Sequence, residues 1–350
     1  MKHFKFLPRL CTLLGLLVFL TGCPNCVHEA KPQGMVYFSY FDTVSYIYSY
    51  AGDPQTDFEA NCQKAADILG EYHKLFDIYY EHAGVSNLRT VNLHAGGDPV
   101  QVDEKLIDFL LYAKDLYETT DGEMNIMMGA VLRLWHDCRE EARTDPAAAR
   151  IPSPDALAEA ARHTDMSCLE IDEENRTVRI TDPLASIDVG ALGKGYATEM
   201  AAMCLRDAGA ESYVLNIGGN IRIVGNKPDG SGWDTGIKNP ENPEEYAMKL
   251  TIADTSCVTS GDYERYFTVD GVRYHHVIDR DTLMPAAHFR SVTVITPHSG
   301  LADGLSTALF AMSYEDGLAL AQKIGNVDVL WISADGTKQY TPGISQMIMK

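Results

Sequence analysis

The segment D-V-G-A-L-G-K-G-Y-A, Asp188 to Ala197, lies where the character of the sequence changes. It follows the strand-like I-T-D-P-L-A-S-I and leads into helical apolar spacing from Leu192 to Ala208. Three glycines around Lys194 at a helix start leave backbone N–H groups available, and the helix dipole there favours anions. The spacing is neither that of a P-loop nor that of a dinucleotide fingerprint. A phosphate-binding turn and a plain tight turn with a solvated lysine therefore remain equal alternatives.

Strands dominate the sequence downstream of this segment. Runs with β-branched residues alternate there with Gly, Pro, Asn or Asp, which is typical of short strands joined by turns. Two helical patterns interrupt them, at Ala302–Ala311 and Glu315–Ile324. The expected strands are Ser212–Ile217, Asn220–Val224, Asp234–Lys238, Ala247–Ile252, Tyr266–Val269, Val272–Ile278 and Arg290–Ile295.

Helices are expected mainly upstream. Apolar residues recur at helical spacing in Asp57–Tyr79, in Leu106–Tyr117, where Asp103 can act as N-cap, and in Ala130–Ala142. Two upstream segments predict strands instead. Met35–Tyr50 is aromatic and β-branched and fits a strand or a bent strand pair, and Cys168–Thr181 alternates around the turn E-E-N as in a β-hairpin. We therefore expect an α+β fold with helices concentrated in the N-terminal half.

The N-terminus has the pattern of an export signal. Three basic residues precede an apolar stretch from Leu10 to Leu20, which is followed by a small-residue site at Cys23. That stretch is about half the ~20 residues needed to span a bilayer. We expect residues 1–22 to be a lipoprotein signal peptide, Cys23 to be lipidated and residues 23–33 to be a linker. An uncleaved anchor helix would leave the protein on the same, extracytoplasmic face of the bacterial cell membrane.

Composition excludes some classes of partner. The chain has 350 residues with 49 acidic and 29 basic side chains, a net charge of −20. Nucleic acid is an unfavourable partner for such a chain, because few basic groups are available to replace the counterions of the phosphate backbone. An anionic ligand would have to be held by local features such as a helix N-terminus, a lysine or a metal. The ~325 residues beyond the signal suffice for one large core or for two domains.

Six cysteines follow Cys23 without a paired C-x-x-C spacing in the folded region, so neither a zinc site nor a redox dithiol is indicated. The even number permits disulfides in an exported chain. Cys62 and Cys204 lie in helical apolar patterns, which favours small buried thiols at these two positions.

Two further segments carry candidate chemistry. In A-D-G-L-S-T-A, Asp303 and Thr307 share one face of a helix, and their hard oxygens suit Mg²⁺. An acidic residue in a first helical turn and an ordinary mid-helix threonine would explain the same pattern. In Y-H-H-V-I-D, His275 and His276 point to opposite faces of a strand, so at most one enters a given site as a general base. A histidine pair that is merely satisfied within a sheet is the alternative.

Together and in this order, the segments resemble the ApbE-type FAD:protein FMN transferase family, from about Met35 to the C-terminus. Seven segments in a fixed order are much more specific than any one of them. The segments are F-D-T at Phe41–Thr43, where the family commonly has M-G-T, D-G-E-M-N-I-M-M-G followed by L-W at Leu134–Trp135, D-V-G-A-L-G-K-G-Y-A, L-N-I-G-G-N at Leu215–Asn220, T-S-G-D-Y at Thr259–Tyr263, Y-H-H-V-I-D and A-D-G-L-S-T-A.

The resemblance implies a T-fold-related architecture with mixed or antiparallel sheets and flanking helices. It assigns residues 34–350 to the transferase domain, either undivided or as two subdomains with the active site between them. It implies that Mg²⁺ is held by the Ala191 carbonyl, Asp303 and Thr307, and that His276 is the catalytic base. The residues implied to line the FAD site are Phe41, Tyr79, Glu123, Met124, Asn125, Asp188, Lys194 and Ile278.

The implied reaction moves FMN from FAD to a Ser or Thr hydroxyl of an exported acceptor flavoprotein, such as a subunit of a membrane electron-transfer system, and releases AMP. Three alternatives remain open at this point: a metal-dependent FAD pyrophosphatase, a flavin-binding lipoprotein without chemistry, and a solute-binding lipoprotein with an unrelated ligand. The loop R-D-T-L-M-P departs from the family's usual P-x-T-G-x-P. Arg280 and Leu283 therefore predict altered loop geometry near His276, and Asn125 stands where the family usually has Asp.

Overall fold

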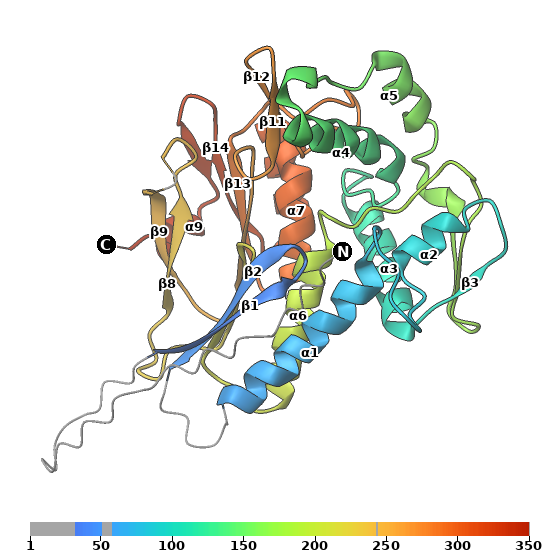
Figure 1. Ribbon diagram of the computed structural model, residues 1–350. Coiled ribbons are helices and arrows are strands. Elements are labelled where there is room, and N and C mark those ends of the chain that lie inside the picture. The colour runs from blue at the N-terminus through green and yellow to red at the C-terminus, as the bar shows by residue number, and fades with distance from the viewer. Residues whose placement is uncertain (1–31, 51–57, 243, 350) are drawn as a thin grey trace, which may run out of the picture.

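The fold is organised around one eight-stranded antiparallel sheet, with strand order β1-β2-β6-β7-β10-β13-β14-β15. The computed structural model describes residues 32–50, 58–242 and 244–349. Figure 1 shows this sheet on one side of the molecule and the helices α2 to α5 on the other. Its strands are β1 Pro32–Tyr40, β2 Thr43–Tyr50, β6 Tyr213–Ile217, β7 Asn220–Val224, β10 Ser256–Gly261, β13 Ser291–Thr296, β14 Asp328–Ile332 and β15 Lys338–Tyr340.

Three smaller antiparallel sheets surround the main one. The β8–β9 hairpin packs beside it, the β11–β12 ribbon follows β10, and β3, β5 and β4 lie next to the helical part. The strands are β3 Val100–Gln101, β4 Leu169–Asp172, β5 Thr177–Ile180, β8 Trp233–Lys238, β9 Tyr246–Ile252, β11 Tyr266–Val269 and β12 Val272–His275.

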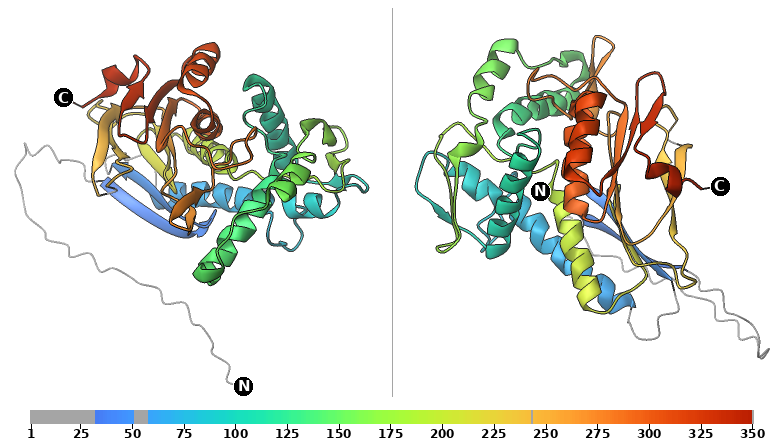
Figure 2. Two further views of the ribbon diagram at one scale, coloured as in Figure 1. Left: turned by 90° about the horizontal axis from the view of Figure 1, so that it is seen from above. Right: turned by 180° about the vertical axis from the view of Figure 1, so that it is seen from behind.

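Helices α1, α6 and α7 lie between the main sheet and helices α2 to α5, an arrangement that also appears from above and from behind (Figure 2). The helices are α1 Phe58–Phe76, α2 Leu88–Leu93, α3 Glu104–Thr119, α4 Gly129–Thr144, α5 Pro154–Ala161, α6 Gly193–Asp207, α7 Ser299–Ala311, α8 Tyr314–Ile324 and α9 Ile344–Met347.

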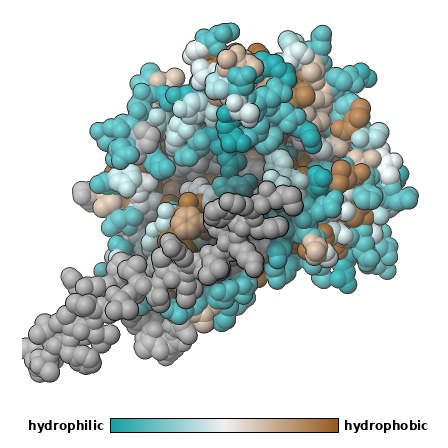
Figure 3. Space-filling model, in the orientation of Figure 1, coloured by the Kyte–Doolittle hydropathy of each residue, from teal (hydrophilic) through white to brown (hydrophobic). Residues whose placement is uncertain are grey.

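Strand periodicity explains why the sheet is buried on both faces. Successive side chains of a strand point to opposite faces. In β14, Val329 and Trp331 join the core under α7 and α8, whereas Leu330 and Ile332 pack against the β8–β9 hairpin. The sheet is thus fixed between two apolar layers, and the loops and helix ends at its margin are free to form a site. The face of the molecule drawn in Figure 3 is mostly hydrophilic, with scattered hydrophobic residues.

The predicted α+β class is confirmed, as is the early concentration of helices. Met35–Tyr50 forms the β1–β2 hairpin, and Asp103 caps α3 by accepting a hydrogen bond from the Lys105 N–H at 2.9 Å. The expected strand Val272–Ile278 was too long, since β12 ends at His275. Ser260 and Gly261, in the T-S-G-D-Y segment, are the last residues of β10, a strand that was not expected.

The five cysteines in the described ranges are free thiols. Cys62 is fully buried, as expected, whereas Cys204 is partly exposed. Within residues 32–50, 58–242 and 244–349, no helix combines the length and the apolar content needed to cross a membrane. The expected signal peptide, the lipidated Cys23 and most of the linker lie outside the described residues.

Candidate active site

A cavity of about 870 Å³ opens between the margin of the main sheet and the helical part. Its walls come from the β1–β2 turn, the segment after α1, the α3–α4 connection, the start of α6, the β11–β12 ribbon and α7. This volume lies within the range of ~300–1,000 Å³ that is usual for small-molecule and cofactor sites. All twelve residues singled out from the sequence line it, namely Phe41, Tyr79, Glu123, Met124, Asn125, Asp188, Ala191, Lys194, His276, Ile278, Asp303 and Thr307.

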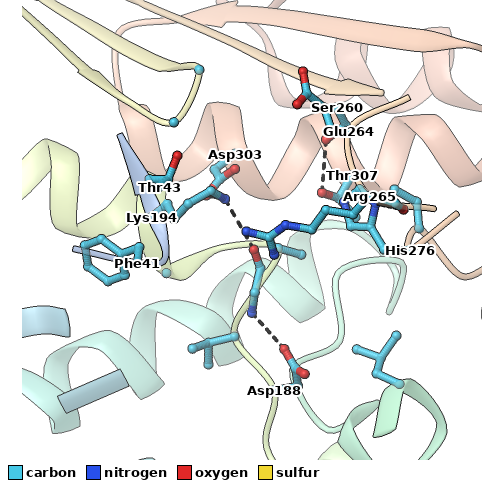
Figure 4. A pocket seen from close by; sticks show the side chains of 18 of the residues that line it. Phe41, Thr43, Asp188, Lys194, Ser260, Glu264, Arg265, His276, Asp303 and Thr307 are labelled. Atoms are coloured by element: carbon cyan, nitrogen blue, oxygen red, sulfur yellow. Dashed lines mark hydrogen bonds and ion pairs between the residues drawn. The ribbon is translucent and has the colours of Figure 1, made fainter. Parts of the chain in front are cut away.

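The start of α6 meets the second turn of α7 inside this cavity. The Gly195 N–H donates a hydrogen bond to Asp303 Oδ2 at 2.7 Å, and Lys194 Nζ lies 3.7 Å from the same oxygen (Figure 4). A Cβ on Gly195 would stand 2.4 Å from the Asp303 Cβ and 2.5 Å from the Ser299 carbonyl oxygen. Glycine is therefore required here by the close approach of the two helices. The sequence predicted a helix from Ala302, which would place Asp303 in its first turn. The helix begins at Ser299, so Asp303 lies in its second turn.

Asp303 is a buried carboxylate whose nearby positive groups are Lys194 and the Gly195 N–H. Its side chain is about as buried as the apolar core, with 4% of the residue exposed. Burial raises the pKa of Asp303, and the nearby Lys194 and the Gly195 N–H act in the opposite direction. A bound cation would favour the ionised form of such a group.

The donor set around Asp303 fits a hard divalent cation. Thr307 and Ala191 line the same cavity, so a carboxylate, a hydroxyl and a backbone carbonyl are available together. Thr307 Oγ1 lies 3.3 Å from Ser260 Oγ, which places β10 beside this face of α7 (Figure 4). No group of three or more His, Cys, Asp or Glu side chains suited to a metal occurs in the described part of the chain. An ion at this position would thus be held mainly by oxygens from the protein and its substrate.

His276 follows β12 directly and lines the cavity; His275 also lines it, but its ring is largely buried against Phe310. The Arg265 carbonyl oxygen lies 3.2 Å from His276 Nδ1. A carbonyl oxygen can only accept, so neutral His276 carries its proton on Nδ1 and keeps the lone pair of Nε2 available. Burial, together with the positive charge of Arg265, lowers the pKa of His276 to about 3. The imidazole is therefore neutral at physiological pH.

Aromatic and acidic side chains form the opposite part of the cavity. Tyr79 stacks on His136 with ring centroids 5.1 Å apart, and burial raises the pKa of Tyr79 to about 12. Burial also raises the pKa of Asp188, although this carboxylate accepts a hydrogen bond from the Gly190 N–H at 2.8 Å. Phe41 lies at the tip of the β1–β2 hairpin, where its ring meets His73 edge-on at 5.5 Å.

Asn125 and Glu123 contribute to the wall in different ways. The Asn125 amide donates to the Thr164 carbonyl at 2.9 Å and accepts from the Met127 N–H at 2.8 Å, so its polar atoms hold the local backbone. Glu123 Oε1 lies 3.1 Å from an Arg280 guanidinium nitrogen. Arg280, which departs from the family's usual residue, thus places a positive charge next to the Glu123 carboxylate.

Leu283, in the loop after His276, has a φ of 60°, in the left-handed region that favours glycine. It occupies the position where the family usually has Gly. Its carbonyl accepts a hydrogen bond from Trp135 Nε1 at 3.0 Å, which ties the loop to α4.

Sequence reasoning missed several cations and aromatic groups of the cavity. Arg265, Arg139 and His136 line it as well. The Arg265 guanidinium has no ion-pair partner among the residues that the structure describes. An available signal was its position two residues after the T-S-G-D-Y segment, as one of few basic side chains in an acidic chain.

Behind the cavity a buried polar network joins α6, α7 and β7. Arg222 and Glu199 form a two-point ion pair, with nitrogen–oxygen distances of 2.9 and 3.3 Å, and both are at least 95% buried. Glu199 also accepts the Ser299 N–H at 2.7 Å, and the Ser299 hydroxyl donates to Asn220 Oδ1 at 2.7 Å. These contacts fix the start of α7, and through it Asp303, relative to α6.

Comparison with known proteins identifies the family. The model of the ApbE family matches residues 41–331. The chain belongs to the ApbE family. An FAD:protein FMN transferase of Treponema pallidum is 31% identical to it over 95% of this chain and 93% of that protein. A second one, from Vibrio cholerae, is 30% identical over 93% and 95% of the two chains.

Solved ApbE structures agree with this assignment. The ApbE protein of Thermotoga maritima has a TM-score of 0.80 and 26% identity, covering 91% of this chain and all of that one. The flavin transferase ApbE of Vibrio cholerae has a TM-score of 0.75 and 25% identity, with 91% and 99% coverage. The resemblance and the predicted architecture are thus confirmed, and so is the expectation of an enzyme homologous to FAD:protein FMN transferases over most of its length. An unrelated solute-binding lipoprotein is excluded.

Proposed function

We propose that this ApbE family member transfers FMN from FAD to a Ser or Thr hydroxyl of an acceptor protein, with a divalent cation, and releases AMP. The observation that carries the proposal is the convergence of Lys194, Asp303 and Thr307 with a neutral His276 in one cavity. A carboxylate, a hydroxyl and a lysine suit a pyrophosphate with its metal, and a neutral imidazole suits deprotonation of a hydroxyl. A protein that merely binds flavin needs no such base.

The cation that fits the donor set is Mg²⁺, held by the Ala191 carbonyl, Asp303 and Thr307. When bound, it would offset the negative charge of the pyrophosphate and polarise a phosphoryl oxygen. Lys194 adds a fixed positive charge to the same region, since its Nζ lies 3.7 Å from Asp303 Oδ2. The chain's own contribution is thus to neutralise and orient an anionic substrate in a protein whose net charge is −20.

His276 acts on the acceptor. Its Nε2 takes the proton of the Ser or Thr hydroxyl, and the oxygen attacks the FMN-side phosphorus of FAD. A new P–O bond to the acceptor forms, the bond from that phosphorus to the bridging oxygen breaks, and AMP leaves with the bonding electron pair. The proton returns from His276 to solvent or to the leaving phosphate. The Arg265 carbonyl keeps Nδ1 protonated, so the ring faces the acceptor with Nε2.

The flavin end of FAD is assigned to the aromatic wall. Phe41, Tyr79 and His136 present ring faces or edges to the cavity, and Ile278 and Met124 add apolar surface. Such rings stack on flat conjugated ligands, and the large apolar area that they bury contributes strongly to binding.

The acceptor that we propose is an exported flavoprotein of a membrane electron-transfer system, reached by an enzyme held at the membrane through Cys23. The support is the signal-like segment before Cys23 and the family's chemistry on protein hydroxyls. We accordingly place the enzyme on the extracytoplasmic face of the membrane.

The test is an intact-mass measurement. The chain without residues 1–23 is incubated with FAD, Mg²⁺ and an exported flavoprotein domain that carries a flavinylation Thr. An acceptor that gains the mass of one FMN residue, in a reaction that needs metal and is lost in His276→Ala and Asp303→Ala, supports the proposal. An unmodified acceptor with free FMN and AMP would instead indicate hydrolysis, and bound, intact FAD would contradict any chemistry at this site.

A further inference from the structure

A second, open groove of about 520 Å³ adjoins the candidate active site. The last turns of α4 form one wall, and the β11 strand forms the other. Arg139, Glu264, Arg265 and Phe267 line both the groove and the main cavity, so the two are continuous. The residues that line the groove alone are Ala142, Arg143, Pro146, Tyr266 and Thr268.

The groove is positively charged in a strongly acidic protein. Three arginines, at positions 139, 143 and 265, face it together with one carboxylate, Glu264. That carboxylate already lies 3.6 Å from Lys238 Nζ. Arg143 is 75% exposed, and both Arg143 and Arg139 pair with Glu140, at 2.9 and 3.5 Å. Arg265 has no ion pair in the described ranges, so the arginines still outnumber the carboxylates around the groove. An acidic segment would thus be attracted to this groove and repelled by most of the remaining surface.

β11 offers an edge to an extended segment. Within the described residues, β11 pairs with β12 alone. Trp135 of α4 covers one face of this ribbon, with ring centroids 6.4 Å from Phe267 and 5.9 Å from Tyr274. Helix α4 therefore packs on the face of the ribbon, and within the described residues no strand pairs with the outer edge of β11. In an antiparallel ribbon, alternate residues direct their N–H and C=O groups to that outer edge, where another strand can bind.

The groove leads directly to His276. Arg265 immediately precedes β11, and its carbonyl oxygen accepts from the His276 N–H at 3.1 Å as well as facing Nδ1 at 3.2 Å. A segment lying along β11 towards Arg265 would therefore arrive beside the candidate base. Because an extended partner advances about 3.4 Å per residue, as β11 does, roughly three or four of its residues would fit in the groove.

We propose that this groove binds an extended, acidic segment of the acceptor protein and directs the neighbouring Ser or Thr to His276. The inference rests on the proposed function, because it gives a location and a charge to the acceptor of that reaction. Arg143, Tyr266 and Thr268 are then acceptor-binding residues outside the FAD cavity.

The test compares two charge reversals on one helix. The full chain in detergent is assayed with FAD, Mg²⁺ and a synthetic peptide in which one Thr is flanked by Asp residues, and with a matched peptide that has Asn in their place. Arg143→Glu changes the groove. The control Arg133→Glu changes a 79% exposed arginine of α4 that does not line it. FAD affinity is measured in parallel by flavin fluorescence.

The expected result is a KM for the Asp peptide raised roughly tenfold or more in Arg143→Glu, with a weaker effect at high salt. FAD affinity should not change, the Asn peptide should show no such difference, and Arg133→Glu should behave as wild type. Wild-type transfer with an unchanged KM in Arg143→Glu would overturn this inference alone. Absence of transfer to either peptide by the wild type would contradict the proposed function, and this inference with it.

Discussion

At the residue scale, the position of the proton on the His276 ring determines whether Nε2 can accept a proton from a hydroxyl. Because Nδ1 faces the Arg265 carbonyl, the lone pair is on Nε2. We expect His276→Gln to lower the rate of FMN transfer by about 10²–10⁴-fold, the usual contribution of a general base, while FAD affinity stays within a few-fold of wild type. Single-turnover kinetics with intact-mass detection measure the first quantity, and flavin fluorescence the second. Equal losses of transfer and FAD binding would instead make His276 a binding residue.

The pH dependence of His276 provides an independent check. Burial and Arg265 lower its pKa to about 3 in the protein without substrate. The neutral ring, with its proton on Nδ1 and a free lone pair on Nε2, therefore predominates at every pH above about 3, whereas an ordinary histidine would become doubly protonated below pH ~6.5. We expect the ring resonances of His276 in NMR spectra to remain constant between pH 8 and 5. A midpoint near 6.5 would contradict the lowered pKa of His276.

At Gly195, in the candidate site, there is no room for an added methyl group. An added Cβ would stand 2.4 Å from the Asp303 Cβ, and the nearest backbone atom, the Ser299 oxygen, cannot rotate away. We expect Gly195→Ala to lower the free energy of unfolding by about 1–3 kcal/mol. Urea denaturation measures this loss. Gly209→Ala is unsuitable as its control because of its positive φ, but Ala197→Gly in the same helix separates helix propensity from the clash.

The sequence alone identified the polar residues at the centre of the site but missed the α4 residues that also line the cavity. Asp303, Thr307, Lys194 and His276 stand in short, ordered segments whose residue types already indicated phosphate, metal and base chemistry. Arg139 and His136 project from a helix whose sequence carries no such pattern, and only the packing of Trp135 against the β11–β12 ribbon turns that helix towards the cavity.

At the scale of single elements, the β1–β2 turn depends on two left-handed residues. Phe41 and Asp42 have φ values of 53° and 51°, which a two-residue hairpin turn of this twist requires. Asp and Gly tolerate this region, whereas β-branched residues do not. We expect Asp42→Val to be less stable than Asp42→Gly by about 1–2 kcal/mol. Paired denaturation curves test this, and equal stabilities would show that the turn adjusts at no cost.

Most of the long, periodic helices and the β-branched strands were predicted from the sequence, with ends accurate to within a few residues, but β14, Asp328–Ile332, was missed. The misses have physical reasons. β10 consists of S-C-V-T-S-G, whose small, polar residues carry little strand signal, yet it lies in the centre of the sheet between β7 and β13. Helix α5 has only eight residues, and its start is defined by the Ser153 cap and Pro154 rather than by an apolar face.

At the scale of the whole molecule, substrate binding should stabilise the fold. Ligands that bind only the native state add RT ln(1 + [L]/Kd) to stability, about 2.7 kcal/mol at a hundredfold excess over Kd. We expect FAD to raise the Tm of the protein more with Mg²⁺ than with EDTA. Asp303→Asn should abolish the difference between these two conditions. A metal-independent shift would argue against the assignment of Asp303 as a ligand.

The N-terminal segment can be tested on the whole chain as well. If Cys23 is lipidated, the protein should partition into the detergent phase of Triton X-114, because an acyl chain contributes about 0.8 kcal/mol per buried CH₂. Cys23→Ser should move it to the aqueous phase. Retention of the variant in the detergent phase would support an uncleaved anchor helix.

The buried Arg222–Glu199 pair has an evolutionary consequence. Loss of either partner alone leaves a charge without compensation in the interior, which costs about 3–5 kcal/mol, a large part of the stability of a typical protein. An apolar replacement of both leaves no buried charge uncompensated. Descendants of this chain can therefore lose the pair only by two coordinated substitutions. The contacts that hold α6, with Lys194, against α7, with Asp303, are thus protected because each single substitution lowers stability. Exposed positions of α4, such as Arg143, can instead change one substitution at a time and adapt to new acceptors.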